Sequence, residues 1–124
     1  MAWASQKGEL GVCKWLYDNG AAADITKANN DGDTPMYIAC WKGHLSVCKW
    51  LFEVGAAKDI TTTSTKGRTP MLTACVNGQL SVCKWLFEVG AAKDITKVDN
   101  SGRTPFLAAC YEGCLLYTSP SPRD

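Results

Sequence analysis

The sequence predicts an all-α repeat solenoid, in which antiparallel helix pairs stack side by side and are joined by β-hairpin-like loops. Three observations predict this fold. Residues of several types recur at a 35-residue period, one long segment occurs twice without a change, and each unit carries the start and stop signals of two short helices. A fixed period of this size is typical of arrays in which each unit buries its apolar face only against its neighbours.

The period is visible in proline, tryptophan and cysteine. The series are Pro35, Pro70 and Pro105; Trp15, Trp50 and Trp85; and two cysteine series, Cys13, Cys48 and Cys83 with Cys40, Cys75 and Cys110. The segment Leu45–Thr61 also recurs letter for letter as Leu80–Thr96. Two segments copied this closely are expected to adopt the same shape. Six of the seven cysteines therefore mark the repeat, and without a secretion signal we expect reduced thiols.

Each unit begins with a turn and a first helix. Gly32 supplies the positive φ that a tight turn often needs. Thr34 is a good N-cap, and Pro35 suits the first helical position because its missing N–H would be unpaired there anyway. The first helix is therefore expected to run roughly from Pro35 to Trp41 and to end at Gly43.

The second helix is expected to run from about Leu45 to Val54 and to end at Gly55. Its apolar residues cover most of the circumference: Leu45, Val47, Cys48, Trp50, Leu51, Phe52 and Val54. Such a helix must be covered on more than one side, which neighbouring repeats provide and an isolated helix pair does not.

These motifs resemble the ankyrin repeat. The segment Thr34–Ala39 (TPMYIA) matches in part the family's Thr-Pro-Leu-His-x-Ala motif. Residues 43–56, with Gly43-His44-Leu45 at their start and Gly55-Ala56 at their end, resemble the family's second-helix pattern. The resemblance covers residues 1 to about 113 and implies stacked helix pairs with a protein-binding role.

The sequence departs from the family pattern in two ways. The period is 35 residues where the family's usual value is 33, and we place the two extra residues around Ala57-Lys58, where they are expected to lengthen the β-hairpin arm. The motif histidine is replaced by Tyr37, Leu72 and Leu107. The buried polar link that the resemblance implies between this histidine and the motif threonine is then missing, so stability is expected to depend more on packing.

The period divides the chain into four units and a tail. We expect a partial repeat at residues 1–28, full repeats at 29–63 and 64–98, a partial repeat at 99–113, and a disordered tail at 114–124. Because Met1 aligns with Met36 inside a repeat, the chain is expected to be a fragment of a larger repeat protein. The tail, CLLYTSPSPRD, resembles one reading frame of a transposase adapter used for sequencing libraries, which predicts a non-native segment. The alternative is a genuine Ser/Pro-rich disordered tail.

Composition excludes several classes of function. The formal net charge of +1 provides no field that would attract nucleic acid or anionic lipid. The sequence contains neither the apolar segment of a signal peptide nor an 18-residue apolar run that could span a bilayer. We therefore expect a cytoplasmic or nuclear protein that is not secreted, does not insert into membranes and does not bind nucleic acid.

Catalytic and cofactor sites find little support. His44 and Cys48 lie one helical turn apart and form the single pair that resembles a Cys/His dyad, but both stand at structural positions of the repeat. Paired C-x₂₋₄-C zinc ligands and a phosphate-binding G-x-x-x-x-G-K-[ST] loop are both missing. A Cys40–Cys48 disulfide is geometrically conceivable, but free buried thiols are favoured. The sequence therefore predicts a protein that is not an enzyme and has no metal or cofactor.

Residues that vary between copies are the candidate contacts with a partner protein. The tryptophan series could form a ligand-stacking ladder, but its position beside core residues favours packing. In ankyrin proteins the turn tips and the first helices line the concave binding face. By this resemblance the candidates are Asn30, Asp31, Asp33, Trp41, Lys42, Thr65, Lys66, Arg68, Val76, Asn77, Asn100, Ser101, Arg103, Tyr111 and Glu112. The alternative is that these exposed positions drift without selection.

The function expected from this pattern is a non-catalytic protein-interaction scaffold. Its rigid surface would bind a partner without a large entropic cost, and aromatic residues such as Trp41 and Tyr111 would supply anchors. Two alternatives remain open. The repeats could target or regulate an enzyme or channel whose active domain lies outside this chain, or they could represent a recent repeat expansion without a specific partner.

Overall fold

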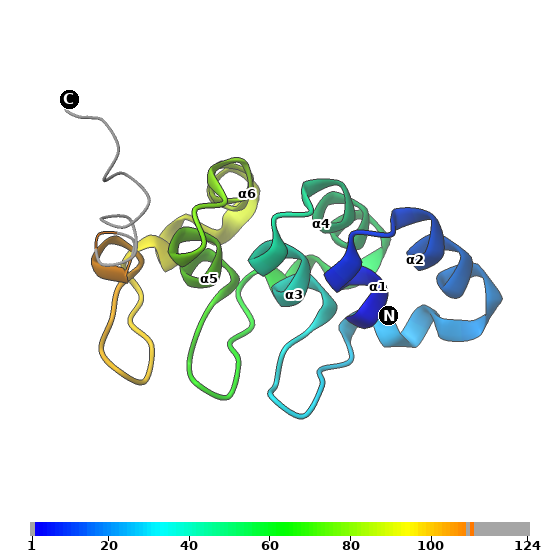
Figure 1. Ribbon diagram of the computed structural model, residues 1–124, viewed down its shortest axis with the longest axis horizontal. Coiled ribbons are helices and arrows are strands. Elements are labelled where there is room, and N and C mark those ends of the chain that lie inside the picture. The colour runs from blue at the N-terminus through cyan, green and yellow to red at the C-terminus, as the bar shows by residue number, and fades with distance from the viewer. Residues whose placement is uncertain (1, 109, 111–124) are drawn as a thin grey trace.

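The computed structural model describes residues 2–108 and 110, which form a row of helix pairs (Figure 1). The α-helices form three pairs, α1 with α2, α3 with α4, and α5 with α6. Their bounds are α1 Ala2–Lys7, α2 Leu10–Leu16, α3 Pro35–Lys42, α4 Leu45–Leu51, α5 Pro70–Val76 and α6 Leu80–Leu86. Residues 105–108 are also helical and continue the row of first helices. The expected solenoid of stacked helix pairs is confirmed, and residues 114–124 lie outside the described part of the chain.

Helices α3 and α5 and the helical residues 105–108 begin at the predicted Thr-Pro pair. The Thr34 Oγ1 atom accepts a hydrogen bond of 3.1 Å from the backbone N–H of Tyr37, and Thr69 and Thr104 make the same bond with Leu72 and Leu107. These bonds satisfy a backbone donor that the first helical turn leaves unpaired. Helix α3 extends to Lys42, one residue beyond the expected end, and stops at a left-handed Gly43 with φ of 79°.

Each second helix ends at the predicted glycine. The wide helical turn η3 (Phe52–Ala56) continues directly from α4, and Gly55, with φ of 132°, is the first residue to leave helical dihedral angles. The same turn follows α2 as η1 (Tyr17–Ala21) and α6 as η5 (Phe87–Ala91). A residue with a Cβ rarely adopts this conformation, which explains why glycine stands at this point in all three described turns, although in η1 Asn19 leaves helical dihedral angles first.

The two extra residues of the period do not lengthen the hairpin arm, so that prediction is wrong. Residues Ala57–Ile60 form a short 3₁₀ helix, η4, which begins directly after η3. Equivalent 3₁₀ helices are η2 (Ala22–Thr26) and η6 (Ala92–Thr96). The extra length is therefore helical in all three copies, and in η4 it places Ile60 in the core, where its side chain is 5% exposed.

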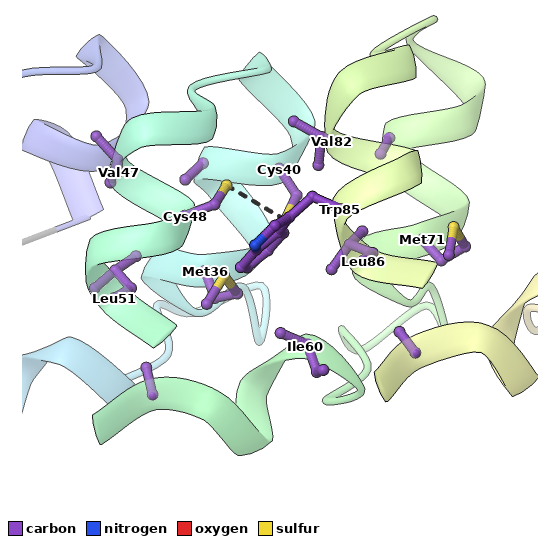
Figure 2. Close-up of a cluster of buried hydrophobic side chains, with 14 of the residues drawn as sticks. Met36, Cys40, Val47, Cys48, Leu51, Ile60, Met71, Val82, Trp85 and Leu86 are labelled. Atoms are coloured by element: carbon purple, nitrogen blue, oxygen red, sulfur yellow. Dashed lines mark hydrogen bonds between the residues drawn. The ribbon is translucent and has the colours of Figure 1, made fainter. Parts of the chain in front are cut away.

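The tryptophans of the second helices join successive repeats. Trp85 packs edge to face on Phe52 of the preceding repeat, with ring centroids 5.7 Å apart, and Trp50 makes the same contact with Tyr17 at 5.6 Å. Figure 2 shows Trp85 lying between Met36, Cys48 and Leu86, at the boundary between two repeats. Trp15, in the first helix pair, is 63% exposed. The packing role expected from the sequence is therefore confirmed for Trp50 and Trp85 but not for Trp15.

Polar bonds also cross each boundary between repeats. His44 Nε2 lies 3.0 Å from the carbonyl oxygen of Gln6 and donates to it, and Gln79 Nε2 donates to the carbonyl oxygen of Trp41 at 3.1 Å. The motif threonines use their hydroxyls for backbone caps, and Leu72, at the position of the family's histidine, is 1% exposed. In the α5/α6 repeat a buried apolar side chain thus stands where the family has a histidine.

Candidate protein-binding groove

A groove lies between two neighbouring hairpin tips and runs up to helices α3 and α5. Its volume is about 330 Å³. The residues that line it are Asp31, Asp33, Tyr37, Trp41, Ser64, Thr65, Lys66, Arg68, Thr73, Val76 and Asn77. Eight of them are candidate contacts predicted from the sequence: Asp31, Asp33, Trp41, Thr65, Lys66, Arg68, Val76 and Asn77.

Each hairpin tip is shaped by one short polar side chain. Asn29 Oδ1 accepts hydrogen bonds from the backbone N–H groups of Asp31 and Asp33, at 2.9 and 3.0 Å. Ser64 Oγ accepts from the next tip in the same way, and so does Asp99 Oδ1 in the tip after that. Such side-chain acceptors fold the backbone into a tight turn. The sequence analysis missed this role, although positions 29, 64 and 99 all carry a short side chain that can accept hydrogen bonds.

Neighbouring tips are tied to each other. The backbone N–H and the hydroxyl of Thr65 both donate to the carbonyl oxygen of Asp31, at 3.2 and 3.0 Å. The backbone N–H of Asn100 donates to the carbonyl oxygen of Lys66, and its side-chain amide donates to the carbonyl oxygen of Thr65. Thr65 and Asn100 were predicted as partner contacts, and the structure gives both a structural role that fixes the spacing of the tips.

The groove combines an aromatic edge with a buried polar floor. Trp41 is 37% exposed, and the ammonium group of Lys42 lies 4.3 Å from the centroid of its ring, within range of a cation–π interaction. Tyr37 and Thr73 also line the groove, although both are buried, so they form its floor. The sequence analysis noted Tyr37 only as a departure from the family motif and did not identify Thr73.

The two walls of the groove carry opposite charges. Asp31 and Asp33 belong to one tip, and Lys66 and Arg68 belong to the next. Burial raises the pKa of the Asp33 carboxyl above its ordinary value and the neighbouring charge of Asp31 adds to the rise, while the two basic residues oppose it. A partner that fits the groove must therefore satisfy an acidic wall on one side and a basic wall on the other.

The basic wall is anchored by a buried carboxylate. Asp99 Oδ2 lies 3.3 Å from Arg103 Nε and 3.9 Å from Arg68 Nε. Burial tends to raise the pKa of Asp99, but the backbone N–H bonds from Arg103 and Ser101, with the charge of Arg103, outweigh burial and lower it. Arg103, a candidate contact, is therefore turned toward Asp99 and does not line the groove.

The remaining candidates lie beside the groove or beyond the described residues. Asn30, Lys42, Asn100 and Ser101 are exposed but do not line it. Tyr111 and Glu112 fall outside the part of the chain that the structure describes.

His44 and Cys48, the pair that resembles a Cys/His dyad, both have structural contacts. His44 is bound to the carbonyl oxygen of Gln6, and Cys48 is fully buried with its Sγ 3.6 Å from Cys40 Sγ. The structural interpretation of both residues is thus supported. The six cysteines among the described residues are free thiols. Within residues 2–108 and 110, three or more His, Cys, Asp or Glu side chains do not gather where they could hold a metal ion.

Comparison with known proteins gives a consistent result. A family model described as ankyrin repeats (many copies) matches residues 1–52, and one described as ankyrin repeats (3 copies) matches residues 56–117. No curated protein matches the sequence. The helices of the described residues are all too short or too polar to cross a membrane.

Proposed function

Because the chain belongs to the ankyrin repeat family, whose members are generally protein–protein interaction modules, we propose that it is a non-catalytic scaffold that binds a partner protein in this groove. One observation carries the proposal. Eight of the positions that differ between otherwise similar repeats come together around one groove, while the Thr-Pro helix starts, the glycines that follow the helices and the segment Leu45–Thr61 are kept in the next copy. Variation gathered around a groove is the pattern expected of a surface adapted to one partner.

The rigidity of the groove supports this function. The tip ties through Thr65 and Asn100, and the Asn29 and Ser64 turns, hold both walls in place before a partner arrives. A preformed surface loses little conformational entropy on binding, so more of the contact energy appears as affinity.

The charges of the walls define the partner's chemistry. Asp31 and Asp33 favour a lysine or arginine of the partner, and Lys66 with Arg68 favours an aspartate or glutamate. Trp41 lines the same groove and offers an apolar ring, and tryptophan is among the residues that most often carry binding energy. We therefore expect a partner segment with an apolar side chain and charges of both signs.

A library of displayed peptides tests the function and its location together. Peptides selected on the wild-type chain should share an apolar side chain and charges of both signs, and Trp41→Ala should weaken their binding at least about tenfold, because it removes an anchor of about 2 kcal/mol. Isothermal titration calorimetry measures the affinities, and circular dichroism checks that the variant stays folded.

Lys49→Ala provides the matched control, because Lys49 is exposed on the second helix, away from the residues that line the groove. This variant should bind the selected peptides as the wild type does. If Lys49→Ala weakens binding while Trp41→Ala leaves it unchanged, the groove is not the binding surface.

A further inference from the structure

Two pairs of cysteine sulfurs lie in contact inside the repeats. Cys40 Sγ is 3.6 Å from Cys48 Sγ, as the dashed line in Figure 2 shows, and Cys75 Sγ is 3.4 Å from Cys83 Sγ. In each pair one cysteine lies on the first helix of the repeat and the other lies on its second helix. None of the four lines the groove, so the pairs are separate from the proposed binding surface.

The distance between the sulfurs suits a covalent bond. A disulfide bond is about 2.05 Å long, so each pair must close by about 1.5 Å to form one. That displacement is shared between two terminal atoms, each on a side chain with a single torsion angle. The same short distance occurs in two successive repeats, which shows that the repeat fold itself brings the two sulfurs together.

The first helix pair provides a natural comparison. Ser5 stands at the position that Cys40 takes in the next repeat. Cys13 stands at the position of Cys48. Both Ser5 and Cys13 are buried, so the α1/α2 pair keeps this arrangement with a serine in place of one cysteine. The first repeat therefore has only one sulfur at this place and cannot form the bond.

We propose that each of the two pairs is a site of reversible oxidation to a disulfide, with hydrogen peroxide as the oxidant. The thiolate of Cys75 attacks one oxygen of the peroxide, the O–O bond breaks, and Cys75 becomes a sulfenic acid. The thiolate of Cys83 then attacks the sulfenic sulfur, the S–O bond breaks and the S–S bond forms. The hydroxide released in each step takes up one of the two thiol protons and leaves as water. The two sulfurs lose one electron each, and the peroxide gains both.

The contact between the sulfurs favours Cys75 as the attacking thiol. It lowers the pKa of Cys75, whereas it raises the pKa of Cys83, and burial adds to that rise. A lower pKa increases the fraction of thiolate, which is the form that peroxide oxidises. Burial raises the pKa of Cys40, so the pair in the α3/α4 repeat is expected to oxidise more slowly.

Each disulfide joins a helix that lines the groove to the second helix of the same repeat. Trp41 and Val76 line the groove, and each directly follows a cysteine of one pair. A crosslink between the helices restricts the unfolded chain, so it stabilises the repeat. We therefore expect the oxidised chain to unfold at a higher temperature than the reduced chain.

Oxidation of the reduced, folded chain is the test. The full chain is treated with hydrogen peroxide, alkylated with N-ethylmaleimide in denaturant, digested with trypsin and analysed by mass spectrometry. Trypsin leaves Cys75 and Cys83 in one peptide, residues 69–84, which should lose two hydrogen atoms and take up no N-ethylmaleimide. Residues 28–42 and 43–49, which carry the other pair, should remain linked. Dithiothreitol should reverse both changes.

Two variants locate the bonds. Cys75→Ser and Cys40→Ser copy the natural arrangement of Ser5 with Cys13, so each should fold, lose one disulfide and keep the other. In the wild type, disulfides within the pairs should exceed those that include Cys13 at least about tenfold, because sulfurs held in contact react as parts of one molecule.

Three results would overturn the proposal. They are oxidation that stops at sulfenic or sulfinic acids, disulfides that join different chains, and disulfides that include Cys13 as often as Cys83. Because the readout is a covalent bond within the chain, the outcome does not depend on whether the groove binds a partner.

Discussion

Two stretches of identical sequence occupy different environments in this molecule. Leu45–Thr61 and Leu80–Thr96 have the same residues in the same order, yet Ile60 is 5% exposed and Ile95 is 45% exposed. The first stretch is covered by the next repeat, in which Trp85 packs on Phe52 and Gly90 lies beside Ile60, whereas among the described residues no equivalent side chains pack on the second stretch. The comparison shows that the local sequence of a repeat determines its helices, whereas the neighbouring repeat determines how far its apolar side chains are buried.

The largest expected effect is at the tryptophan that joins the two stretches. Trp85→Ala should destabilise the chain by about 3–5 kcal/mol, because it removes a buried ring and leaves a cavity between repeats. Trp15→Ala, at the equivalent but 63% exposed position, should change stability by no more than about 0.5 kcal/mol. Equilibrium unfolding in urea measures both values. Equal losses for the two variants would show that the boundary between repeats does not determine burial.

The matched isoleucines should show the next largest difference. Ile60→Ala should cost at least about 2 kcal/mol, since its side chain fills the core, and Ile95→Ala should cost less than about 1 kcal/mol. Because the flanking residues are the same, local helix propensity cancels in the comparison. Urea unfolding of the pair is the test, and a cost for Ile95→Ala as large as that for Ile60→Ala would contradict the account.

Much of the fold could be predicted because its signals are local. The Thr34-Pro35 start, the Gly43 end and the Gly55 end each follow from one residue's backbone preference, and all three appear where expected. The exposure of Trp15 could not be predicted from the same reasoning, because it depends on a neighbour outside the helix itself. The 3₁₀ helix at Ala57–Ile60 was missed because the length of the period shows that two residues are inserted but not which backbone conformation they adopt.

The groove was predicted in outline but not in detail. Variation between copies identified Asp33 and Arg68, which the structure brings to the same cavity. The pattern could not separate residues that face a partner from residues that hold the tips together, such as Asn100, because both kinds are exposed and polar. Thr73 was missed because it is buried and lies on a helix, where it carries no signal of a surface role.

The cysteine pairs provide a chemical test of the same comparison. Iodoacetamide should alkylate Cys75 and Cys83 in the folded chain at least about tenfold faster than Cys40 and Cys48, because the second pair is fully buried and must be exposed before it reacts. A tenfold ratio of rates corresponds to a free-energy difference of about 1.4 kcal/mol. The sulfurs of Cys75 and Cys83 lie 3.4 Å apart, and the hydrogen bond between them lowers the pKa of Cys75 and raises that of Cys83, so Cys75 should react first. Mass spectrometry of digested samples follows each site. Equal rates for all four thiols would mean that the covered copy opens as readily as the uncovered one.

The smallest expected effect is the pH dependence of buried aspartates. Burial raises the pKa of Asp59, which the hydroxyl bond from Thr62 only partly offsets, and burial also raises the pKa of Asp94. A carboxyl whose folded-state pKa is raised binds protons more tightly when folded, so its contribution to stability becomes more favourable as pH falls toward that pKa. Asp99 has a lowered pKa and behaves in the opposite way, since its stabilisation is lost as pH falls through its folded value.

Asparagine variants separate the two kinds of carboxyl. The stability of the wild type relative to Asp59→Asn should increase between pH 7 and pH 4, whereas its stability relative to Asp99→Asn should decrease as the pH falls below about 4. Thermal unfolding at a series of pH values gives both slopes. Two slopes of the same sign would refute the assignment.

Amide hydrogen exchange followed by NMR is the most direct measurement of the central claim. Helices α4 and α6 have the same sequence, so their intrinsic exchange rates are the same beyond the first residue, and any difference in protection reports packing alone. The amides of Cys48 and Phe52 should exchange more slowly than those of Cys83 and Phe87, whose side chains are more exposed. Equal protection in the two helices, or greater protection in α6, would contradict the conclusion that the neighbouring repeat provides the burial.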